Sequence, residues 1–274
     1  MLRAAWLTLS AATGRARGFV IPYRYAAGVT PPASYPALVP LFAVAEPEFR
    51  ALLAQVRGYL DRLLTFGGEE PPAPRFDQDW FPRLDAAIAY TMTRMLRPAR
   101  VVEIGSGHST RFFARAVADA GSTTKIVTID PAPRATITGL PVEFVRSTLQ
   151  LAGLDPFRGL APGDMVSVDS SHILMPGTDV DIVLNTVLLA VPAGVLIHFH
   201  DIFLPDSYPA DWSWRGYNEQ NAVAALATSG GYRLRWASRY VATRLANEIA
   251  AAGLDRLPLV PGARESSLWL EKVR

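Results

Sequence analysis

The sequence predicts an α/β fold in which a mostly parallel sheet carries helices on both faces, preceded by a helical extension. Three observations predict it. From Arg100 onward, short apolar runs of strand length alternate with segments of helical spacing. Gly- and Pro-containing turns separate these segments. Such alternation is typical of parallel strands joined by crossover helices. We therefore expect two domains, residues 1–99 and residues 100–274.

Residues 1–99 are expected to form an N-terminal arm and a helical extension. The first 46 residues are rich in Pro and aromatic residues, and they are too apolar for a disordered tail. Apolar residues then recur at helical spacing from Phe49 to Leu64, and Gly67-Gly68 stops them. A second helix has Pro82 in its first turn and ends at Pro98. We expect this extension to cover the substrate or to contact a second copy of the chain.

The second part of the chain contains seven predicted strands. They are Val101–Ile104, Lys125–Ile129, Val142–Val145, Met165–Val168, Val195–His200, Tyr232–Ala237 and Ser267–Leu270. Helices are predicted from about Thr110 to Ala120, from a capping box at Thr178 and Asp181 to about Ala190, and from Asn218 to Gly230.

Composition excludes several classes of protein. Of 274 residues, Lys and Arg number 27 and Asp and Glu 25, with no dense basic run, so we expect no nucleic-acid partner. The absence of Cys excludes disulfides, thiolate metal sites and cysteine nucleophiles. No apolar run reaches the ~18 residues of a membrane-spanning helix. Ala4–Ala12 loosely resembles a signal peptide, but it is weakly hydrophobic and lacks a clear cleavage site. We predict instead an N-terminal helix that packs on the body of a cytoplasmic protein.

The turn after the first strand predicts a nucleotide-like ligand. It reads Glu103-Ile-Gly-Ser-Gly-His-Ser-Thr110, and its two glycines allow the backbone to bend sharply beside a helix N-terminus. Thr110 occupies the place of the third glycine of a dinucleotide fingerprint, which disfavours that reading. Asp130 ends the next strand, where a carboxylate can accept hydrogen bonds from both hydroxyls of a ribose.

All four histidines of the chain fall near the ends of predicted strands. Asp169 and His172 follow the fourth strand, and His200 and Asp201 follow the fifth. Because the carboxyl ends of neighbouring parallel strands meet at one crevice, these four side chains should face one another. His198 lies further back in its strand and is predicted to be a hydrogen-bonded core residue. His108 lies in the glycine turn and is predicted to contact the ligand there.

The segment Val101–Phe203 resembles the class I S-adenosylmethionine (SAM)-dependent methyltransferases, in particular the subgroup with Asp-x-x-His after strand four and His-Asp after strand five. The resemblance implies a Rossmann-like, seven-stranded sheet whose last strand is antiparallel. It also implies that Glu103 can bind the methionine ammonium of SAM and that the loop after the third strand contacts the cofactor. The candidate cofactor-binding residues are Glu103, Gly105, Ser106, Gly107, His108, Asp130, Arg146 and Ser147.

The residues after strands four and five have two possible chemistries. Asp169, His200 and Asp201 could hold a divalent metal such as Mg²⁺, Mn²⁺, Zn²⁺ or Fe²⁺. Alternatively, Asp169, His172 and His200 could form a metal-free catalytic group that removes a proton from a hydroxyl. Both alternatives remain open from the sequence.

A long aromatic loop, Leu204–Tyr217, follows the fifth strand. We expect it to shape the pocket of the acceptor, with Trp80 and Phe81 covering the other side. It could instead pack on the N-terminal arm or contact a second copy of the chain.

The sequence thus predicts a SAM-dependent O-methyltransferase acting on a small organic acceptor.

Two other functions are weighed against this one. The first is a non-catalytic SAM-fold module that binds a partner through Trp212, Trp214 and Tyr217, and the intact glycine and acidic positions argue against it. The second is an NAD-dependent oxidoreductase. Thr110 and the lack of an evident hydride-transfer site disfavour it.

Overall fold

The computed structural model describes residues 2–13, 18–19 and 21–274. These residues divide into two compact units, Met1–Ala33 and Ser34–Arg274. In the first unit, Leu2–Ala12 forms helix α1 and Ala26–Gly28 forms a single 3-10 turn, η1. The helix predicted over Ala4–Ala12 is therefore confirmed.

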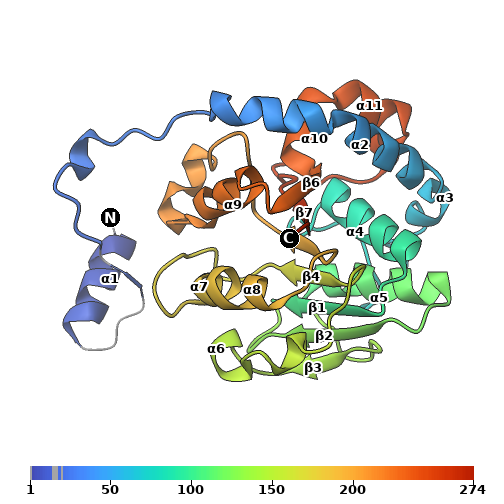
Figure 1. The fold of residues 1–274 in the computed structure, drawn as a ribbon, viewed down its shortest axis with the longest axis horizontal. Coiled ribbons are helices and arrows are strands. Elements are labelled where there is room, and N and C mark those ends of the chain that lie inside the picture. Colours follow the sequence, from blue (N-terminus) through green and yellow to red (C-terminus); the bar gives the residue numbers. More distant parts are fainter. Residues whose placement is uncertain (1, 14–17, 20) are drawn as a thin grey trace. The chain divides into compact units, whose positions relative to one another are not determined.

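A seven-stranded sheet forms the centre of the second unit, and its strand order is β3-β2-β1-β4-β5-β7-β6. All pairs are parallel except those of β7, which runs antiparallel to both β5 and β6. Figure 1 shows this order from β3 at the bottom to β6 at the top. The Rossmann-like α/β fold with an antiparallel last strand is confirmed. The strands are β1 (Arg100–Ile104), β2 (Lys125–Ile129), β3 (Glu143–Val145), β4 (Met165–Val168), β5 (Leu196–Phe199), β6 (Tyr232–Ala237) and β7 (Leu268–Lys272).

Helices connect and cover the strands. The longer ones are α2 (Val39–Arg57), α4 (Arg83–Leu96), α5 (His108–Ala120) and α9 (Glu219–Thr228). Shorter helices are α3 (Leu60–Leu63), α6 (Leu149–Ala152), α7 (Asp179–Ile182), α8 (Leu188–Ala190), α10 (Ser238–Arg244) and α11 (Ala246–Ala251). A π-helical turn, η4 (Val183–Val187), joins α7 to α8. The 3-10 turns are η2 (Pro36–Leu38), η3 (Asp155–Phe157), η5 (Ala210–Arg215) and η6 (Leu254–Arg256).

Helices α2 and α4 share one hydrophobic core with the sheet. Helix α4 packs on α5, and α2 contacts α4, β6 and α11. The side chains of Phe42 and Phe49 on α2 are fully buried and pack on Tyr240 and Trp236. The residues from Ser34 onward therefore belong to the same compact unit as the strands.

The structure departs from the predicted elements in three places. Helix α2 begins at Val39 rather than near Phe49 and accommodates Pro47, because burial of Phe42 anchors its first turns. Helices α10 and α11 occupy a segment for which no element was predicted. Strand β5 ends at Phe199, so that His200 lies just beyond the strand. This last difference places the His200 ring at the edge where ligands bind in such sheets.

Candidate active site

The glycine turn after β1 is pressed against the end of β4. Gly105 has a φ of +84°, and a Cβ at this position would lie 1.9 Å from the carbonyl oxygen of Asp169. The Gly105 N–H donates to the carbonyl of Ile129 at 2.9 Å, which also ties the turn to the end of β2. Only glycine fits this backbone without displacing a neighbouring strand. The turn therefore holds its main chain at the mouth of a cavity.

That cavity, here called the cofactor cavity, has a volume of about 400 Å³. Most of the predicted cofactor residues line it. They are Gly105, Ser106, Gly107, His108, Asp130 and Ser147, and they are joined by Asp169, Thr178 and Asp179 among others. Asp130 accepts hydrogen bonds from the Ser106 N–H at 2.7 Å, the Ser106 hydroxyl at 3.1 Å and the Ala132 N–H at 2.7 Å. These bonds fix its carboxylate at the end of β2.

Two predicted cofactor residues lie outside this lining. Glu103 is fully buried beneath the turn, where it accepts hydrogen bonds from the hydroxyls of Ser109 at 2.6 Å and Thr110 at 2.5 Å. Burial raises the pKa of Glu103 to about 7. Arg146 instead lines a separate cavity, and its guanidinium lies over the ring of Phe144 at 5.0 Å.

His108 lies at the start of α5 in a cationic environment. Burial, together with the charges of Arg111 and Arg75, lowers the pKa of His108 to about 4. Its Nδ1 atom has no hydrogen-bond partner within the described chain. A neutral imidazole at the cavity wall can therefore still accept or donate a hydrogen bond to a ligand.

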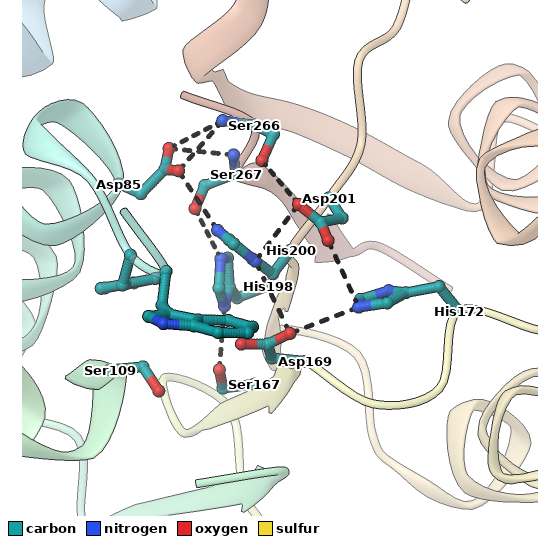
Figure 2. Close-up of polar contacts among 12 residues, drawn as sticks. Asp85, Ser109, Ser167, Asp169, His172, His198, His200, Asp201, Ser266 and Ser267 are labelled. Atoms are coloured by element: carbon teal, nitrogen blue, oxygen red, sulfur yellow. Dashed lines mark hydrogen bonds and ion pairs between the residues drawn. The ribbon is translucent and has the colours of Figure 1, made fainter. Parts of the chain in front are cut away.

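Four side chains from the loops after β4 and β5 converge into an acid–imidazole cluster, defined as Asp169, His172, His200 and Asp201 (Figure 2). Asp169 Oδ1 lies 3.4 Å from His172 Nε2 and 3.5 Å from His200 Nδ1. Asp201 lies 3.5 Å from His172 Nε2 and 3.6 Å from His200 Nδ1. The backbone is left-handed at His172 (φ 59°) and Asp201 (φ 54°), which is unusual for such residues. The predicted convergence of the two strand ends is thus observed.

Each imidazole of the cluster has a second carboxylate behind it. His172 Nδ1 lies 3.0 Å from Glu219, and His200 Nε2 lies 3.3 Å from Asp85. Both outer carboxylates are completely buried. The backbone N–H groups of Ser266 and Ser267 also donate to Asp85, which fixes it between α4 and β7. The outer carboxylates therefore orient both imidazole rings.

The charges in the cluster are coupled. Burial alone would lower the pKa of His172 and of His200, but the surrounding carboxylates outweigh it and raise both pKa values well above the ordinary value. Burial would likewise raise the pKa of Asp169, yet the two imidazoles hold that pKa well below its usual range. Charge pairing therefore favours the protonated form of His172 and His200 and the ionised form of Asp169.

His198 has the structural role predicted for it. Its Nδ1 pairs with the Ser167 hydroxyl and its Nε2 with the Ser267 hydroxyl, each at 2.8 Å, and its ring stacks on Trp269 with centroids 4.7 Å apart. Burial lowers the pKa of His198 to about 3. This residue is a neutral core histidine.

A second cavity of about 230 Å³ opens on the other side of the cluster. Asp169, Trp80 and Arg134 line both cavities, so the two adjoin. The remaining lining residues are Asp79, His172, His200, Asp201, Trp212, Arg215, Gly262, Ala263 and Arg264. From the aromatic loop, Trp212 faces this cavity, whereas Trp214 does not line it and is 58% exposed. Phe81 lines the cofactor cavity and packs on His200, with ring centroids 5.4 Å apart.

Sequence reasoning missed five residues of this region, namely Asp85, Arg134, Arg215, Glu219 and Arg264. A signal existed for one of them. Asp85 lies among Leu84, Ala86 and Ala87 on α4 and is fully buried, and a carboxylate on a buried helix face requires a polar partner. No comparable sequence feature distinguishes the three arginines, because the chain has many other arginines on its surface.

Two further results concern metals and membranes. Across residues 2–13, 18–19 and 21–274, no group of three or more His, Asp, Glu or Cys side chains is arranged so that it could hold a metal ion. Within the same described residues, no helix is both long and apolar enough to cross a membrane.

Comparison with known structures gives distant overall similarity. The SAH-bound O-methyltransferase from Bacillus cereus is 15% identical, with 82% of this chain and 91% of that chain covered and a TM-score of 0.43. The SAH-bound methyltransferase PaMTH1 from Podospora anserina is 17% identical, with coverages of 94% and 100% and a TM-score of 0.40. The cofactor-bound protein Rv0187 from MTB is 18% identical, with coverages of 83% and 90% and a TM-score of 0.43. Likeness at this level carries no weight in assigning an activity.

The sequence matches no curated protein. Comparison with protein-family models gives a more specific result. Residues 102–202, which contain the glycine turn, Asp130 and the whole acid–imidazole cluster, match the family model described as a methyltransferase domain. The matched segment runs from within β1 to the residues after β5, and it lies in a Rossmann-like sheet with an antiparallel β7.

Proposed function

We propose that this protein is a class I SAM-dependent methyltransferase that transfers the methyl group of SAM to a hydroxyl oxygen of a small organic acceptor. SAM would occupy the cofactor cavity and the acceptor would occupy the second cavity. One observation carries the proposal. Asp169 lines both cavities and contacts both imidazoles of the cluster, so that a carboxylate stands where the two ligands would meet.

The cofactor side would bind SAM through the glycine turn and Asp130. Each carboxylate oxygen has two lone pairs, and Oδ2 of Asp130 already accepts from the N–H and the hydroxyl of Ser106, whereas Oδ1 accepts only from Ala132. Oδ1 can therefore accept from one ribose hydroxyl, and Oδ2 can accept from the other once the Ser106 hydroxyl turns away. His108 and Ser147 line the same cavity and complete the proposed contacts. Glu103 would act from beneath, by holding Ser109 and Thr110 in place.

The chemical step requires a positioned nucleophile and a proton acceptor. The acceptor oxygen attacks the methyl carbon in line with the carbon–sulfur bond, which breaks with its electron pair moving to sulfur and leaves SAH. The hydroxyl proton becomes strongly acidic as the new bond forms, so a carboxylate of low pKa can take it. Asp169 is suited to this role because its side chain is 32% exposed, whereas those of His172 and His200 are 4% and 5% exposed. The imidazoles would hold Asp169 in place.

A divalent cation at the cluster is a second candidate, and one observation favours it. The far nitrogen of each imidazole faces a buried carboxylate, which is the usual surrounding of metal-binding histidines. The described side chains are not spaced as a ready metal-binding set, however, so Asp169, His200 and Asp201 would have to move to hold an ion. We therefore assign no step to a metal. Metal analysis of the purified enzyme, with activity measured after chelation and after adding back Mg²⁺, Mn²⁺ or Zn²⁺, tests this candidate.

The N-terminal extension is proposed to cover the acceptor. Asp79 and Trp80, which precede α4, line the second cavity, and this supports a covering role for that part of residues 1–99. A contact with a second copy of the chain remains the alternative, and the mass of the protein in solution tests it.

The experiment that tests the proposed function follows the methyl group. The enzyme is incubated with methyl-labelled SAM and a panel of small hydroxyl-, amine- and thiol-bearing molecules, and the labelled products are analysed by mass spectrometry and NMR. We expect O-methyl products with the hydroxyl compounds. Transfer only to nitrogen or sulfur, or SAM binding without any transfer, would contradict the proposal.

A further inference from the structure

We infer that the acceptor is an organic acid that carries a hydroxyl group, and that its carboxylate is bound by Arg215 and Arg134 in the second cavity. The inference deepens the proposed function and rests on it for the identity of the reacting group. It starts from two guanidinium groups that line this cavity, are held in place by aromatic rings, and have no carboxylate partner among the described residues.

Arg215 is fixed at the cavity wall without an ion pair to a described residue. Its guanidinium carbon lies 4.0 Å from the ring centre of Trp212, and its Nη1 donates to the Tyr217 hydroxyl at 3.1 Å. Its Nε is buried and has no hydrogen-bond partner. Because Nε has almost no accessible surface, a ligand in the cavity would be bound by the terminal nitrogens, and Nη2 makes no hydrogen bond to a described residue. Arg215 therefore keeps an unused donor group at the lining of the second cavity.

Arg134 comes from the opposite wall, in the loop after β2. Its guanidinium lies over Trp80 at 4.6 Å, and it has neither a hydrogen bond nor an ion pair with any described residue. Trp80 and Arg134 line both cavities, which places this charge beside the expected path of the methyl group. Stacking orients the planar guanidinium, and a preoriented fork suits two-point binding of a carboxylate.

Arg264 provides an internal contrast. It lines the same cavity, but Asp211 already engages it through two contacts of 2.9 and 3.1 Å. The positive charge of Arg264 is therefore largely neutralised, whereas Arg134 and Arg215 remain available for an anionic ligand.

The lining of the cavity carries charges of both signs. Its carboxylates are Asp79, Asp169 and Asp201, and its guanidiniums are Arg134, Arg215 and Arg264. A hydroxyl of the acceptor would be accepted by Asp169, whereas a carboxylate of the acceptor would be repelled there and attracted by the arginines. A small acid that fits about 230 Å³ is therefore favoured with its hydroxyl toward Asp169 and its carboxylate toward Arg215 and Arg134.

The test uses matched acceptor pairs. Small aromatic and aliphatic hydroxy acids are each compared with their primary amide and methyl ester, which keep the hydroxyl and the shape but lose the charge. Binding to the enzyme saturated with SAH is measured by calorimetry, and methyl transfer is measured separately with labelled SAM. We expect at least one acid to bind about 10- to 100-fold more tightly than its amide, because charge-assisted bonds to two guanidiniums are lost in the amide.

Variants localise the effect. Arg215→Gln and Arg134→Gln should each bring the acid-to-amide ratio close to one while thermal stability stays near the wild-type value. SAH affinity should also stay near the wild-type value in Arg215→Gln, whereas acceptor binding to Arg134→Gln is measured at saturating SAH because Arg134 also lines the cofactor cavity. Arg264→Gln should change the ratio less. Arg158→Gln is the charge-matched control, because Arg158 is 80% exposed and paired with Asp155 on the surface. Its ratio should equal that of the wild type.

The outcomes separate the two proposals. Acids that bind through Arg215 but receive no methyl group would uphold the inference and contradict O-methylation. Methyl transfer to acids, amides and esters at equal rates would uphold O-methylation and overturn the inference. The inference also fails if no acid binds better than its amide, or if the preference survives in both arginine variants.

Discussion

The two adjoining cavities are built from different kinds of residue. The cofactor cavity is lined largely by main chain and short side chains from consecutive elements, such as Gly105, Ser106 and Ser147. The second cavity is lined by charged and aromatic side chains from segments that are far apart in the sequence, including Trp80, His200 and Arg264. Under the proposed function, the first cavity would bind one fixed ligand, SAM, whereas the second would determine which acceptor is used.

The same difference predicts how substitutions in each cavity should act. In the cofactor cavity, backbone shape is decisive, so substitutions that add bulk should strongly reduce stability and cofactor binding. At the other end, charge and hydrogen bonding are decisive, so isosteric changes should remove activity while the fold is kept.

The largest effect is expected at the glycine turn. Gly105→Ala places a Cβ 1.9 Å from a backbone oxygen at a φ of +84°, so the turn or β4 must move. We expect a loss of about 2 to 5 kcal/mol in the free energy of unfolding and a loss of SAM binding. Gly139→Ala is the matched control, because Gly139 has a φ of +90° and open space around it. If both variants lose the same stability in thermal unfolding, the close approach to Asp169 has no importance.

The next effect is chemical rather than structural. Asp169→Asn keeps the shape of the side chain but removes the proposed proton acceptor at the junction of the cavities. We expect kcat to fall about 10²- to 10⁴-fold with SAM affinity changed little. Asp181→Asn is the control, because that carboxylate lies at the start of α7 and is not among the residues that line either cavity. Undiminished turnover by Asp169→Asn would exclude Asp169 as the proton acceptor.

A smaller effect is expected from the aromatic loop. Trp212 lines the second cavity and lies 4.0 Å from the Arg215 guanidinium, whereas Trp214 does not line the cavity, is 58% exposed and lies further from the same guanidinium, at 5.3 Å. Trp212→Ala should raise the KM of the acceptor by about tenfold, which corresponds to ~1.4 kcal/mol, and should leave the Kd of SAM unchanged. Trp214→Ala should have a lesser effect. Steady-state kinetics with both variants would contradict this assignment if the two KM values rose equally.

The last expected effect depends on pH, and it separates the core histidine from the cluster. The pKa of His198 is lowered to about 3 in the folded chain, below its value of about 6.5 when unfolded. The unfolded state therefore binds a proton that the native state does not as pH falls from about 6.5 to 3. His198 should thus lower stability by about 1.4 kcal/mol per pH unit within that range.

Denaturant unfolding at pH 7, 6 and 5 checks this expectation. As pH falls, the wild type should lose stability relative to His198→Gln. The comparison isolates His198 because the other titrating groups are common to both proteins. A difference independent of pH would mean that folding does not lower the pKa of His198.

The contrast between the cavities also explains what could be predicted from the sequence. Hydrophobic periodicity and turn residues located the individual strands, and β2, β4 and β6 match their predicted bounds. The glycine turn and Asp130 were recognisable because they are local in sequence. Asp169, His172, His200 and Asp201 could be brought together because parallel strand ends share one edge.

The remaining parts depend on contacts that no local pattern encodes. Asp85 meets His200 across 115 residues, and Glu219 meets His172 across 47. Helices α10 and α11 are too short for a clear periodic signal, and they are stabilised by packing on α4 and α2. Arg134 and Arg215 acquire their significance only because Trp80 and Trp212 hold them beside the same cavity.

The central claim is that the glycine turn and Asp130 bind SAM, and calorimetric titration tests it most directly. SAM and, separately, NADH are titrated into the wild type, Asp130→Ala and Asp169→Asn. We predict one SAM per chain and no NADH binding in the wild type. We also predict about 10- to 100-fold weaker SAM binding in Asp130→Ala, because charge-assisted bonds to the ribose are lost, and near wild-type binding in Asp169→Asn. Binding of NADH without SAM, or SAM affinity unchanged by the loss of the Asp130 carboxylate, would contradict the account.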